Sequence, residues 1–565
     1  MITHNTTVVP ISIQGMVASI RDDHYPLIHN LFLAQQKVSK RNYGGRHHKE
    51  FTTEILQKSI VQQMGKYHFV GCGAIKYLMQ SNPWIKFKIE KVVPERTREL
   101  SEIVIPEKIK SHPNFLLNGK PRDTYYDSLE ACRVNPNGVV KLPPQSGKTA
   151  ILLTLGYNMR QQVGSGVIIV TTDNLRKQLI RRAKEYGTDE YFVTYEEYSK
   201  LYEKGTLDES KSWVIVATPS LLSRRNSTNK LYNRDTFKWL IFDECHRVSS
   251  PTGQSLYYMF PNLVRSYGFS ATYTKSAVPE NLLTFNKVDY EDALRISSFG
   301  KIIYERKTSD MIKEGSTNKT VLINFVYRWN YEDLSAMVQQ IGKEYSASSY
   351  HSLLELLGLN KDRMRVLSDI QTMLNQTGRN TMMNVSRRSY GFSMLDTTKR
   401  KDTVAWYGSS KVYIPSLMIP SLKDFNAKAV TPSDSTSYEL YKNVYESKVL
   451  SSSNLNQYYG NLIKNVISSA SVGGEGVSFD IPVNACILAE GKGTNRITVI
   501  QRAGRTSSAT SDKTSVIINI VDEDAPPVLR KHSVTRATSI KQEYGIKPIV
   551  VNSLDELQKV LTTLD

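Results

Sequence analysis

The chain has 565 residues, too many for a single hydrophobic core, so we expect several domains. Its 40% hydrophobic and 22% charged residues are ordinary for a globular protein. No apolar run reaches the length of about 18 residues that a membrane span needs, so no membrane partner is expected. The formal net charge of +19 favours a polyanionic partner, most simply a nucleic acid, with a solvated basic surface as the alternative.

The positive charge is concentrated near the N-terminus. Residues 1–120 contain 17 Lys and Arg against 9 Asp and Glu, a net charge of +8 in about a fifth of the chain. We therefore predict a small basic α+β domain at 1–115 that binds nucleic acid. The segment at about 106–120 is expected to be a linker, because a proline ends the apolar run before it.

The four cysteines are scattered along the chain and form no CxxC pair; they are Cys72, Cys132, Cys245 and Cys486. This spacing predicts neither a structural zinc site nor a disulfide framework. The N-terminus lacks the basic-then-apolar order of a signal peptide. We therefore expect an intracellular, cytoplasmic protein.

Apolar runs alternate with helical segments from 116 to 305 and again from 306 to 535. In the first region strands are expected at 138–142, 167–170, 213–217 and 240–242, with a helix at 175–186. In the second region strands are expected at 321–323, 381–383, 404–407, 485–488 and 516–518. Such runs indicate α/β lobes with parallel sheets covered on both faces, whose catalytic loops follow the C-terminal ends of the strands.

Two segments depart from this alternation. Residues 408–460 are rich in Ser, Asn and Tyr and are interpreted as an insertion with long loops. Residues 536–565 are expected to form a C-terminal strand and helix. Ser553 and Glu556 form a capping-box pattern before an apolar stripe, which is more typical of a docked core helix than of a partner-binding one.

A candidate phosphate loop follows the first predicted strand of the first lobe. Its end, Gly147-Lys148-Thr149, matches the GxxxxGK[ST] pattern, but Leu142 stands where the pattern begins with glycine. Backbone amides at such a turn bind phosphates, the lysine reaches the β and γ oxygens, and the threonine ligates Mg²⁺. A surface loop holding these residues by chance is the alternative. The predicted loop residues are Pro144, Gln145, Ser146, Gly147, Lys148 and Thr149.

Two adjacent acids and a histidine follow the apolar run 239–242. Alternation along a strand sends Asp243 and Glu244 in different directions. Asp243 is then placed to bind Mg²⁺ through water, and Glu244 to act as the general base for the attacking water. The alternatives are a solvated acidic turn and, for His246, a capping histidine.

The order of several short segments is more specific than any of them alone. The chain contains, in this order, KLPPQSGKT, VIIVTTDNLRKQL, VATPSLL, LIFDECH, FSAT, SSASVGGEGVSF and VIQRAGRT. This series resembles motifs I, Ia, Ib, II, III, V and VI of the superfamily 2 (DExH/DECH-box) helicases over residues 120–535. The DECH form and the segment MIKEGSTNKTVLINF resemble the XPB/UvsW branch, and a phage or viral source, with a host-cytoplasmic location, fits that branch.

The resemblance implies two tandem RecA-like lobes that use ATP and Mg²⁺. Lys148, Thr149 and Asp243 are implied to bind phosphate and metal, and Glu244 to activate water. The residues implied to couple hydrolysis to strand movement are His246, Ser270 and Thr272. The residues implied to contact the nucleotide from the second lobe are Gly476, Gln501, Arg502 and Arg505, the last as an arginine finger.

The chain departs from the family pattern at three points. Gln145 stands where the family usually has glycine, and Ser508 where it has a second motif VI arginine. The segment before motif I has tyrosine in place of the usual adenine-contacting glutamine. Tyr125 or Tyr126 is therefore a candidate to stack on the base, with a packed tyrosine as the favoured alternative.

We predict an ATP-driven nucleic-acid helicase or translocase, a monomeric motor that favours single-stranded or branched DNA. Backbone contact with phosphates predicts tolerance of sequence and strong salt dependence. The candidate nucleic-acid contacts are Thr171, Thr172, Thr218, Pro219, Arg387 and Arg388, the Arg pair having a solvated loop as its alternative. The rival functions are a double-strand translocase or branch remodeller, an RNA-directed or transcription-associated ATPase, and a non-catalytic nucleic-acid-binding scaffold with a degenerate ATP site.

Overall fold

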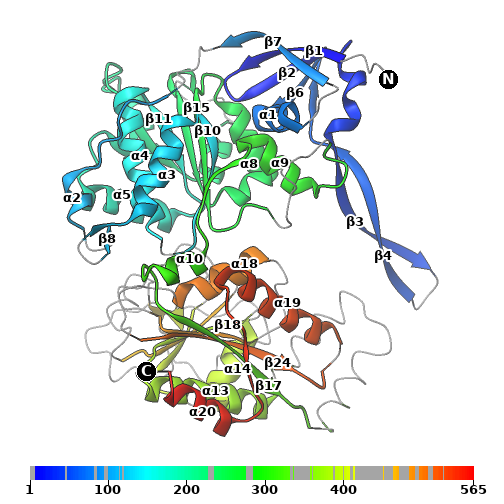
Figure 1. Cartoon of the computed structure of the whole chain (residues 1–565), viewed down its shortest axis with the longest axis vertical. Helices are drawn as coiled ribbons and strands as arrows, with labels where there is room; N and C mark the ends of the chain where they lie inside the picture. The colour runs from blue at the N-terminus through cyan, green and yellow to red at the C-terminus, as the bar shows by residue number, and fades with distance from the viewer. Residues whose placement is uncertain are drawn as a thin grey trace. The chain divides into compact units, whose positions relative to one another are not determined.

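The chain divides into two compact units, unit 1 (Met1–Arg306) and unit 2 (Lys307–Asp565) (Figure 1). In the computed structural model, the described residues are 7–44, 48–81, 85–93, 99–112, 115–117, 120–144, 146–226, 234–274, 284–330, 332, 335, 357–358, 360–385, 388–398, 400–406, 412–413, 449–450, 462–469, 483–489, 496–506, 513–525 and 527–564. Within them, no helix is both long and apolar enough to cross a membrane.

Unit 1 begins with a mixed five-stranded sheet in the order β5-β6-β2-β1-β7, in which only β1 and β7 pair in parallel. Its elements are β1 (Thr7–Gln14), β2 (Val17–Arg21), β5 (Gln62–Met64), β6 (Tyr67–Gly71), α1 (Cys72–Ser81) and β7 (Ile85–Val93). Between β2 and β5 lie η1 (Tyr25–Leu27), η2 (His29–Phe32) and a long hairpin of β3 (Leu33–Gly44) and β4 (His48–Ser59). Figure 1 shows this hairpin extending from the body of unit 1.

The rest of unit 1 is built on a seven-stranded parallel sheet in the order β12-β13-β11-β14-β15-β10-β16. Its strands are β10 (Asn137–Lys141), β11 (Gly166–Ile169), β12 (Phe192–Thr194), β13 (Val214–Ala217), β14 (Trp239–Asp243), β15 (Arg265–Ser270) and β16 (Ile302–Glu305). Its helices are α3 (Asp123–Val134), α4 (Lys148–Gln162), α5 (Asp173–Tyr186), α6 (Tyr195–Glu203), α7 (Pro219–Asn226), η3 (Arg234–Thr236), η4 (Cys245–Ser249), α8 (Pro251–Met259) and α9 (Tyr290–Phe299).

Alternation along the central strands explains why this sheet is buried on both faces. Ile168 and Ile241 belong to a core with α3, α4 and α5, whereas their neighbours Val167 and Leu240 belong to a second core with α8 and α9. A strand that buries both faces has no polar position, which is why these strands read as continuous apolar runs in the sequence.

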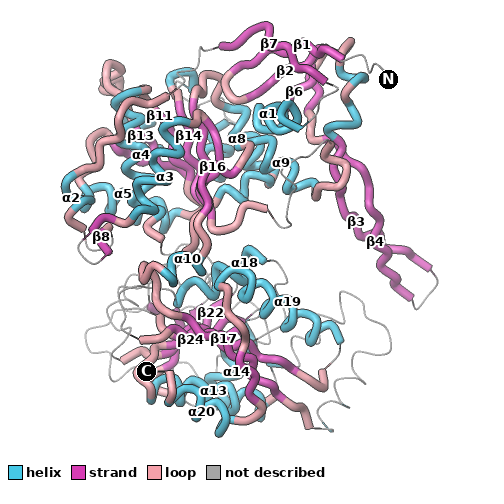
Figure 2. Tube along the Cα trace, in the orientation of Figure 1, coloured by secondary structure: helices cyan, strands magenta, loops and turns pink. Residues whose placement is uncertain are grey.

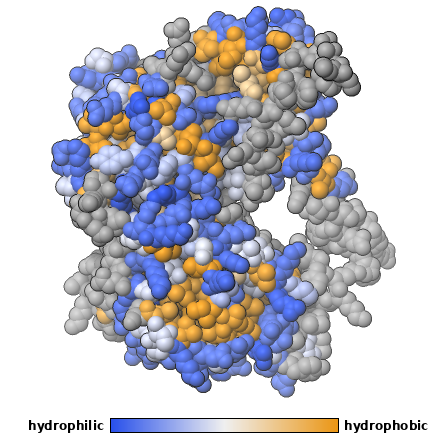
Figure 3. All heavy atoms as spheres, in the orientation of Figure 1, coloured by the Kyte–Doolittle hydropathy of each residue, from blue (hydrophilic) through white to orange (hydrophobic). Residues whose placement is uncertain are grey.

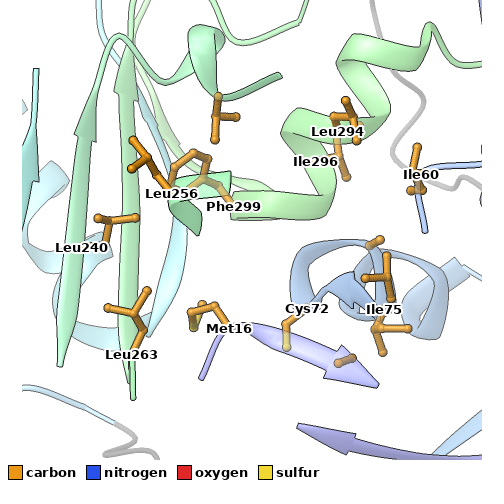
Figure 4. Packing of buried hydrophobic residues seen from close by; sticks show 14 of the residues in the cluster. Met16, Ile60, Cys72, Ile75, Leu240, Leu256, Leu263, Leu294, Ile296 and Phe299 are labelled. Atoms are coloured by element: carbon orange, nitrogen blue, oxygen red, sulfur yellow. The ribbon is translucent and has the colours of Figure 1, made fainter. Parts of the chain in front are cut away.

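The second core continues into the N-terminal sheet. Residues from β1, β2, α1 and α9 form one cluster of buried hydrophobic side chains. Figure 4 shows this packing for Met16, Ile60, Cys72, Ile75, Leu294, Ile296 and Phe299. The small N-terminal domain therefore shares its core with the parallel-sheet lobe, and the two form one compact unit.

Unit 2 contains a nine-stranded sheet in the order β21-β20-β19-β22-β18-β23-β24-β17-β25, of which the last seven are parallel. The strands are β17 (Thr320–Tyr327), β18 (Thr381–Val385), β19 (Thr403–Trp406), β20 (Val412–Tyr413), β21 (Val449–Leu450), β22 (Asn465–Ser469), β23 (Ala485–Leu488), β24 (Ser515–Asp522) and β25 (Ile549–Val551). The helices are α10 (Thr308–Lys313), α13 (Lys361–Gln376), α14 (Arg388–Thr398), α18 (Arg496–Ala503), η6 (Gly504–Thr506), α19 (Pro527–Tyr544) and α20 (Leu554–Thr562).

Helices cover both faces of the unit 2 sheet (Figure 2). One core joins the strands to α13, α14 and α20, and the other joins them to α18 and α19. Hydrophobic side chains also gather on the visible surface over β17 and β24 (Figure 3). The expected fold class, two α/β lobes with parallel sheets and a smaller mixed N-terminal domain, is confirmed.

One expectation about connections is wrong, and another falls mostly outside the described residues. The predicted linker at 106–120 contains α2 (Glu107–Lys110) and a short hairpin of β8 (Leu116–Leu117) and β9 (Lys120–Pro121). It is anchored because Ile109 and Phe115 are buried in the α3–α5 core. The predicted insertion at 408–460 lies outside the described residues except for β20 and β21.

Candidate active site

Three predicted motifs meet at one edge of the parallel sheet in unit 1. The phosphate loop follows β10, Asp243 ends β14, and Ser270 ends β15. Since β15 pairs with both β14 and β10, it places its last residue between the other two motifs. Parallel strands bring their C-terminal ends to the same edge, which is where α/β sheets place their sites.

The turn from β10 into α4 is shaped by Gly147. This residue has φ of 87°, a conformation that favours glycine, and it caps the N-terminus of α4. The first amides of α4, beginning at Lys148, have no partner inside the helix, so they form a site for an anion. The Ser146 hydroxyl is fully buried and has no hydrogen-bond partner among the described residues.

Tyr125 of α3 forms a support beneath this turn. A Cβ atom added to Gly147 would lie 2.5 Å from the Tyr125 hydroxyl oxygen. The Tyr125 ring is 1% exposed and packs edge-on against Phe115, with ring centroids 4.6 Å apart. Burial raises the pKa of Tyr125, so the hydroxyl stays protonated. Tyr125 is therefore packed against the phosphate loop rather than presented to a base.

Tyr126 faces elsewhere. It is 47% exposed and lines a cavity of about 580 Å³. The other residues that line this cavity are Glu102, Ile103, Ile105, Asp127, Leu129, Glu130 and Arg133, and none of them belongs to the phosphate loop. Contact of Tyr126 with a nucleotide base stays a prediction.

Glu244 occupies an unusual backbone conformation. It has φ of 54° and ψ of 51°, the left-handed region that non-glycine residues rarely enter. Directly after it, η4 begins with Cys245, whose sulfur packs so closely on β15 that a Cβ at Gly268 would lie 2.7 Å away. Backbone strain of this kind is concentrated at functional sites, and here it turns the Glu244 side chain out of the strand direction.

The side chains at this edge form one continuous hydrogen-bonded chain. The Lys148 Nζ lies 3.2 Å from Glu244 Oε1, and the Ser270 hydroxyl lies 3.2 Å from Glu244 Oε2. His246 Nδ1 lies 3.1 Å from the Ser270 Oγ and 3.3 Å from Glu244 Oε2. The Ser270 hydroxyl also lies 2.7 Å from the Thr272 carbonyl oxygen. Glu244 therefore connects Lys148 at the start of α4 with His246 of η4 and Ser270 at the end of β15.

The charges of this cluster shift each other's pKa values. Burial and the neighbouring Glu244 carboxylate raise the pKa of Asp243 to about 6. Burial alone would raise the pKa of Glu244, but Lys148 and His246 outweigh it and hold that pKa well below its usual range. Burial alone would lower the pKa of the Lys148 amine, but the Glu244 and Asp243 carboxylates outweigh it. At neutral pH, Glu244 is therefore ionised and Lys148 charged.

This arrangement suits a phosphate ester and its metal ion. Lys148 and the start of α4 supply positive charge, Thr149 is an exposed hydroxyl, and Asp243 is a second carboxylate beside Glu244. Among the described residues, no group of three or more His, Cys, Asp or Glu side chains is arranged to hold a metal. Mg²⁺ needs only one or two protein ligands when phosphates supply the rest, so Thr149 and Asp243 fit that ion.

The candidate nucleic-acid contacts of unit 1 lie at the same edge, on the neighbouring strands. Thr171 and Thr172 follow β11, and Thr218 and Pro219 follow β13. The Thr172 side chain caps α5 by accepting a hydrogen bond from the Leu175 amide at 3.3 Å. The Thr171 hydroxyl is buried and has no partner among the described residues. Strand order thus separates these residues from Lys148, with β14 and β15 between them.

The candidates of unit 2 are described only in part. Gln501 and Arg502 are buried residues of α18, 6% and 4% exposed. Arg505 belongs to η6 and Arg388 begins α14, but the side chains of both lie outside the described residues. The positions wholly outside them are Gln145, Arg387, Gly476 and Ser508.

Two residues contribute to the site in ways that the sequence did not predict. Tyr125 supports Gly147 although the two are 22 positions apart. Arg295 of α9 donates a hydrogen bond from Nε to the His246 carbonyl oxygen at 2.7 Å. Tyr125 was a candidate for contact with a base and not for support of the loop. Arg295 belongs to no motif, and a lone arginine inside a helix has no sequence signal that separates it from a surface arginine.

The chain is similar to several known proteins. The family model described as "ResIII: Type III restriction enzyme, res subunit" matches residues 104–275, which contain the phosphate loop and the segment from Asp243 to Thr272. A comparison with curated protein sequences found no match.

Solved structures show weak similarity. Dbp5 of S. cerevisiae, bound to RNA and ADP BeF3, is 13% identical with a TM-score of 0.49, covering 83% of this chain and 100% of its own. The ATP-dependent Type ISP restriction-modification enzyme LlaBIII, bound to DNA, is 13% identical with a TM-score of 0.48, covering 78% and 32%. UvsW of T4 is 14% identical with a TM-score of 0.37, covering 97% and 100%.

Proposed function

We propose that this chain hydrolyses ATP and uses the energy to move along or unwind nucleic acid, with DNA as the favoured substrate. The observation that carries the proposal is the chain of hydrogen bonds from Lys148 through Glu244 to Ser270 and His246. It places a cation for phosphate, a carboxylate base and a polar connection to a neighbouring strand in one cluster. The family match over 104–275 supports the same reading.

Glu244 is the proposed general base. Its low pKa means that it is ionised at neutral pH and able to accept a proton from an attacking water. Lys148 now pairs with Glu244 at 3.2 Å. When the γ-phosphate is bound, the Lys148 amine moves its charge toward the phosphate, so Glu244 loses its strongest partner and becomes more basic. Nucleotide binding would thus activate the base.

ATP and Mg²⁺ fit the residues that surround this base. The α4 N-terminus and Lys148 would hold the phosphates. The buried Ser146 hydroxyl, which has no partner within the described part of the chain, is suited to a phosphate oxygen. Thr149 and Asp243 would hold Mg²⁺, which neutralises phosphate charge when bound. Asp243 must be ionised for this role, and its raised pKa makes metal binding weaker as the pH falls below about 6.

Ser270 is the proposed link between hydrolysis and strand movement. Its hydroxyl contacts Glu244 on one side and the backbone of Thr272 on the other. His246 contacts both Ser270 and Glu244, so a change at the γ-phosphate is passed to the segment after β15. We assign His246, Ser270 and Thr272 to this coupling.

Nucleic acid is the partner that the charge and the sheet edge support. The net charge of +19 attracts a polyanion, and the strand ends at Thr171 and Thr218 lead into the starts of α5 and α7, whose amides are suited to backbone phosphates. Pro219, Arg387 and Arg388 complete the proposed contacts. Because phosphates carry no sequence information, binding should tolerate sequence and weaken strongly with salt.

The residues of unit 2 are assigned by their motif. Gln501, Arg502 and Arg505 are proposed to assist hydrolysis, with Arg505 stabilising charge on the transferring phosphoryl group. Gly476 is proposed to contact the nucleotide. Arg505→Ala should lower kcat and leave the affinity of the chain for ATP nearly unchanged, because the phosphate loop is intact.

The proposal is tested by measuring ATPase rates with single-stranded DNA, forked DNA and RNA in parallel. We expect turnover that needs Mg²⁺ and that rises when DNA is added. Absence of stimulation by all three nucleic acids would reject the motor function. Strand displacement from a fork, measured against migration of a branched junction, then separates an unwinding enzyme from a remodeller. Sedimentation during turnover tests whether the motor is a monomer.

A further inference from the structure

The helix α9 carries a buried ionic cluster that the proposed mechanism does not use. Arg295 is 3% exposed and forms an ion pair with Asp292, which is fully buried. The same guanidinium lies 3.0 Å from Glu291, which is about half exposed. A buried pair of this kind contributes little net stability, because desolvation offsets the attraction. Net stability therefore does not explain why this ion pair is buried here.

One side of α9 is hydrogen bonded to the segments that follow Glu244 and Ser270. Arg295 Nε donates to the carbonyl oxygen of His246 at 2.7 Å, two residues after Glu244. The hydroxyl of Tyr273, the residue after Thr272, donates to the Arg295 carbonyl at 2.6 Å. These contacts tie the His246 backbone and the Tyr273 side chain to one helix. The guanidinium thereby holds the segment that keeps Glu244 in its left-handed conformation.

The other side of α9 is bound to the N-terminal sheet. The Gly71 amide donates to the Ser297 hydroxyl at 3.0 Å. Added Cβ atoms would lie 2.0 Å from the Ser297 carbonyl oxygen at Gly71 and 2.1 Å from the Ile296 carbonyl oxygen at Gly73. The backbones of the two elements therefore touch, without side chains between them. Figure 4 shows the hydrophobic side chains that pack around this contact.

We propose that α9 couples the N-terminal sheet to hydrolysis, with Arg295 as the positioning residue that holds the His246 backbone. This inference rests on the proposed function, because it requires nucleic acid to contact the N-terminal region. Close-packed backbone contacts do not deform continuously, so a shift of the sheet moves α9 as a rigid element. Such a movement displaces Glu244, because the Arg295–His246 hydrogen bond connects α9 to the segment that follows Glu244. Binding at the N-terminal region thereby changes the hydrolytic rate.

The first test separates positioning from folding. Arg295→Met alone removes the ion pair between Arg295 and the fully buried Asp292 carboxylate and is expected to lower Tm. The double variant Arg295→Met/Asp292→Leu removes both charges and should restore Tm, yet it still lacks the bond to His246. We expect kcat of this double variant to fall about 10- to 100-fold, with the KM for ATP unchanged, because a displaced base affects the chemical step alone.

A matched control lies on the same helix. Glu291→Gln removes the exposed partner of Arg295 and leaves the contacts with Asp292 and His246 in place. Its kcat, KM and Tm should equal those of the wild type. A loss of kcat in this control equal to that of the double variant would show that charge near α9, rather than the His246 contact, matters, and it would overturn the assignment to Arg295.

The second test approaches α9 from the N-terminal side. Gly73→Ala should push α1 away from α9, because its Cβ would meet the Ile296 carbonyl. The control for local strain without a clash is Gly65→Ala, whose φ of 62° disfavours alanine but where no atom lies within 4 Å of the added Cβ. Stimulation by a single-stranded DNA oligonucleotide should fall about threefold or more in Gly73→Ala, with the rate without DNA unchanged. If Gly73→Ala lowers Tm, Ser297→Ala, which deletes the hydrogen bond without adding volume, takes its place.

The outcomes distinguish this inference from the proposed function. If wild-type ATPase is not stimulated by DNA or RNA, the proposed function fails. If the wild type is stimulated and both the double variant and Gly73→Ala keep wild-type kcat and stimulation, only the role of α9 fails. Loss of ATP binding together with kcat in the Tm-restored double variant would mean that Arg295 merely maintains the site, and it would also overturn the inference.

Discussion

Asp243→Asn should stabilise the nucleotide-free protein while it abolishes activity. Burial and the Glu244 carboxylate raise the pKa of Asp243 from 3.8 to about 6. The native state thus holds this proton more tightly than the unfolded chain does, so the carboxyl lowers stability as the pH rises from about 4 to about 6. This rise of the Asp243 pKa corresponds to a loss of at most about 3 kcal/mol in the free energy of unfolding. The amide of the variant does not titrate, and its oxygen can still accept the hydrogen bond from the Glu244 amide.

Thermal unfolding at pH 5, 6, 7 and 8 in EDTA measures this effect. The advantage of the variant should be about half of its full value at pH 5 and should level off above about pH 7. Mg²⁺-dependent hydrolysis should be lost at every pH. Asp235→Asn, at an exposed carboxylate of η3, serves as the control and should change Tm little. A variant that is less stable than the wild type at pH 8, or an advantage independent of pH, would show that the Asp243 carboxylate does not lower stability.

Three further substitutions test neighbouring parts of the site. Lys148→Ala should weaken ATP binding about 10- to 100-fold, as measured by equilibrium titration, because a charged hydrogen bond contributes about 1.5–3 kcal/mol. Gly147→Ala should destabilise the protein by more than Gly65→Ala in thermal unfolding, since both have positive φ but only Gly147 meets Tyr125 at 2.5 Å. Ser270→Ala should keep basal ATPase within about tenfold of the wild type while strand displacement is lost, because the hydroxyl links Glu244 to the next segment without touching phosphate.

The parallel-sheet lobes were predictable because their signals are local. Strands buried on both faces are continuous apolar runs, so β11, β13 and β14 were expected within a residue or two of their observed bounds. Parallel pairing then brings the strand ends to one edge, which predicts that Lys148 and Glu244 lie close together. Chain order and strand type were therefore enough to place the central pair of the site.

The remaining features depend on contacts between residues far apart in the sequence. The parallel pairing of β1 with β7 joins residues about 80 positions apart, and no motif marks it. The predicted linker at 106–120 is anchored by Ile109 and Phe115, whose burial no local pattern revealed. The small residues at Gly71 and Gly73 permit the contact with α9, but a pair of glycines does not identify its partner.

The shared core of unit 1 changes how the N-terminal region should be tested. Removing residues 1–120 would expose the hydrophobic cluster that joins α1 and α9, so the truncated chain would lose packing as well as charge. Charge substitutions at exposed positions are the better experiment. Lys86→Gln and Lys88→Gln on β7 should reduce the salt dependence of DNA binding by about one unit of slope for each phosphate contact that is lost.

The most direct test of the account is the ATPase rate of Glu244→Gln measured beside its ATP affinity. Glutamine keeps the size of the side chain and its ability to hydrogen bond with Lys148 and Ser270, but it cannot accept a proton from water. We predict ATP binding close to that of the wild type and a fall in kcat of at least about 100-fold, with or without DNA. Turnover near the wild-type rate in a folded variant that binds ATP would contradict the assignment of Glu244 as the base.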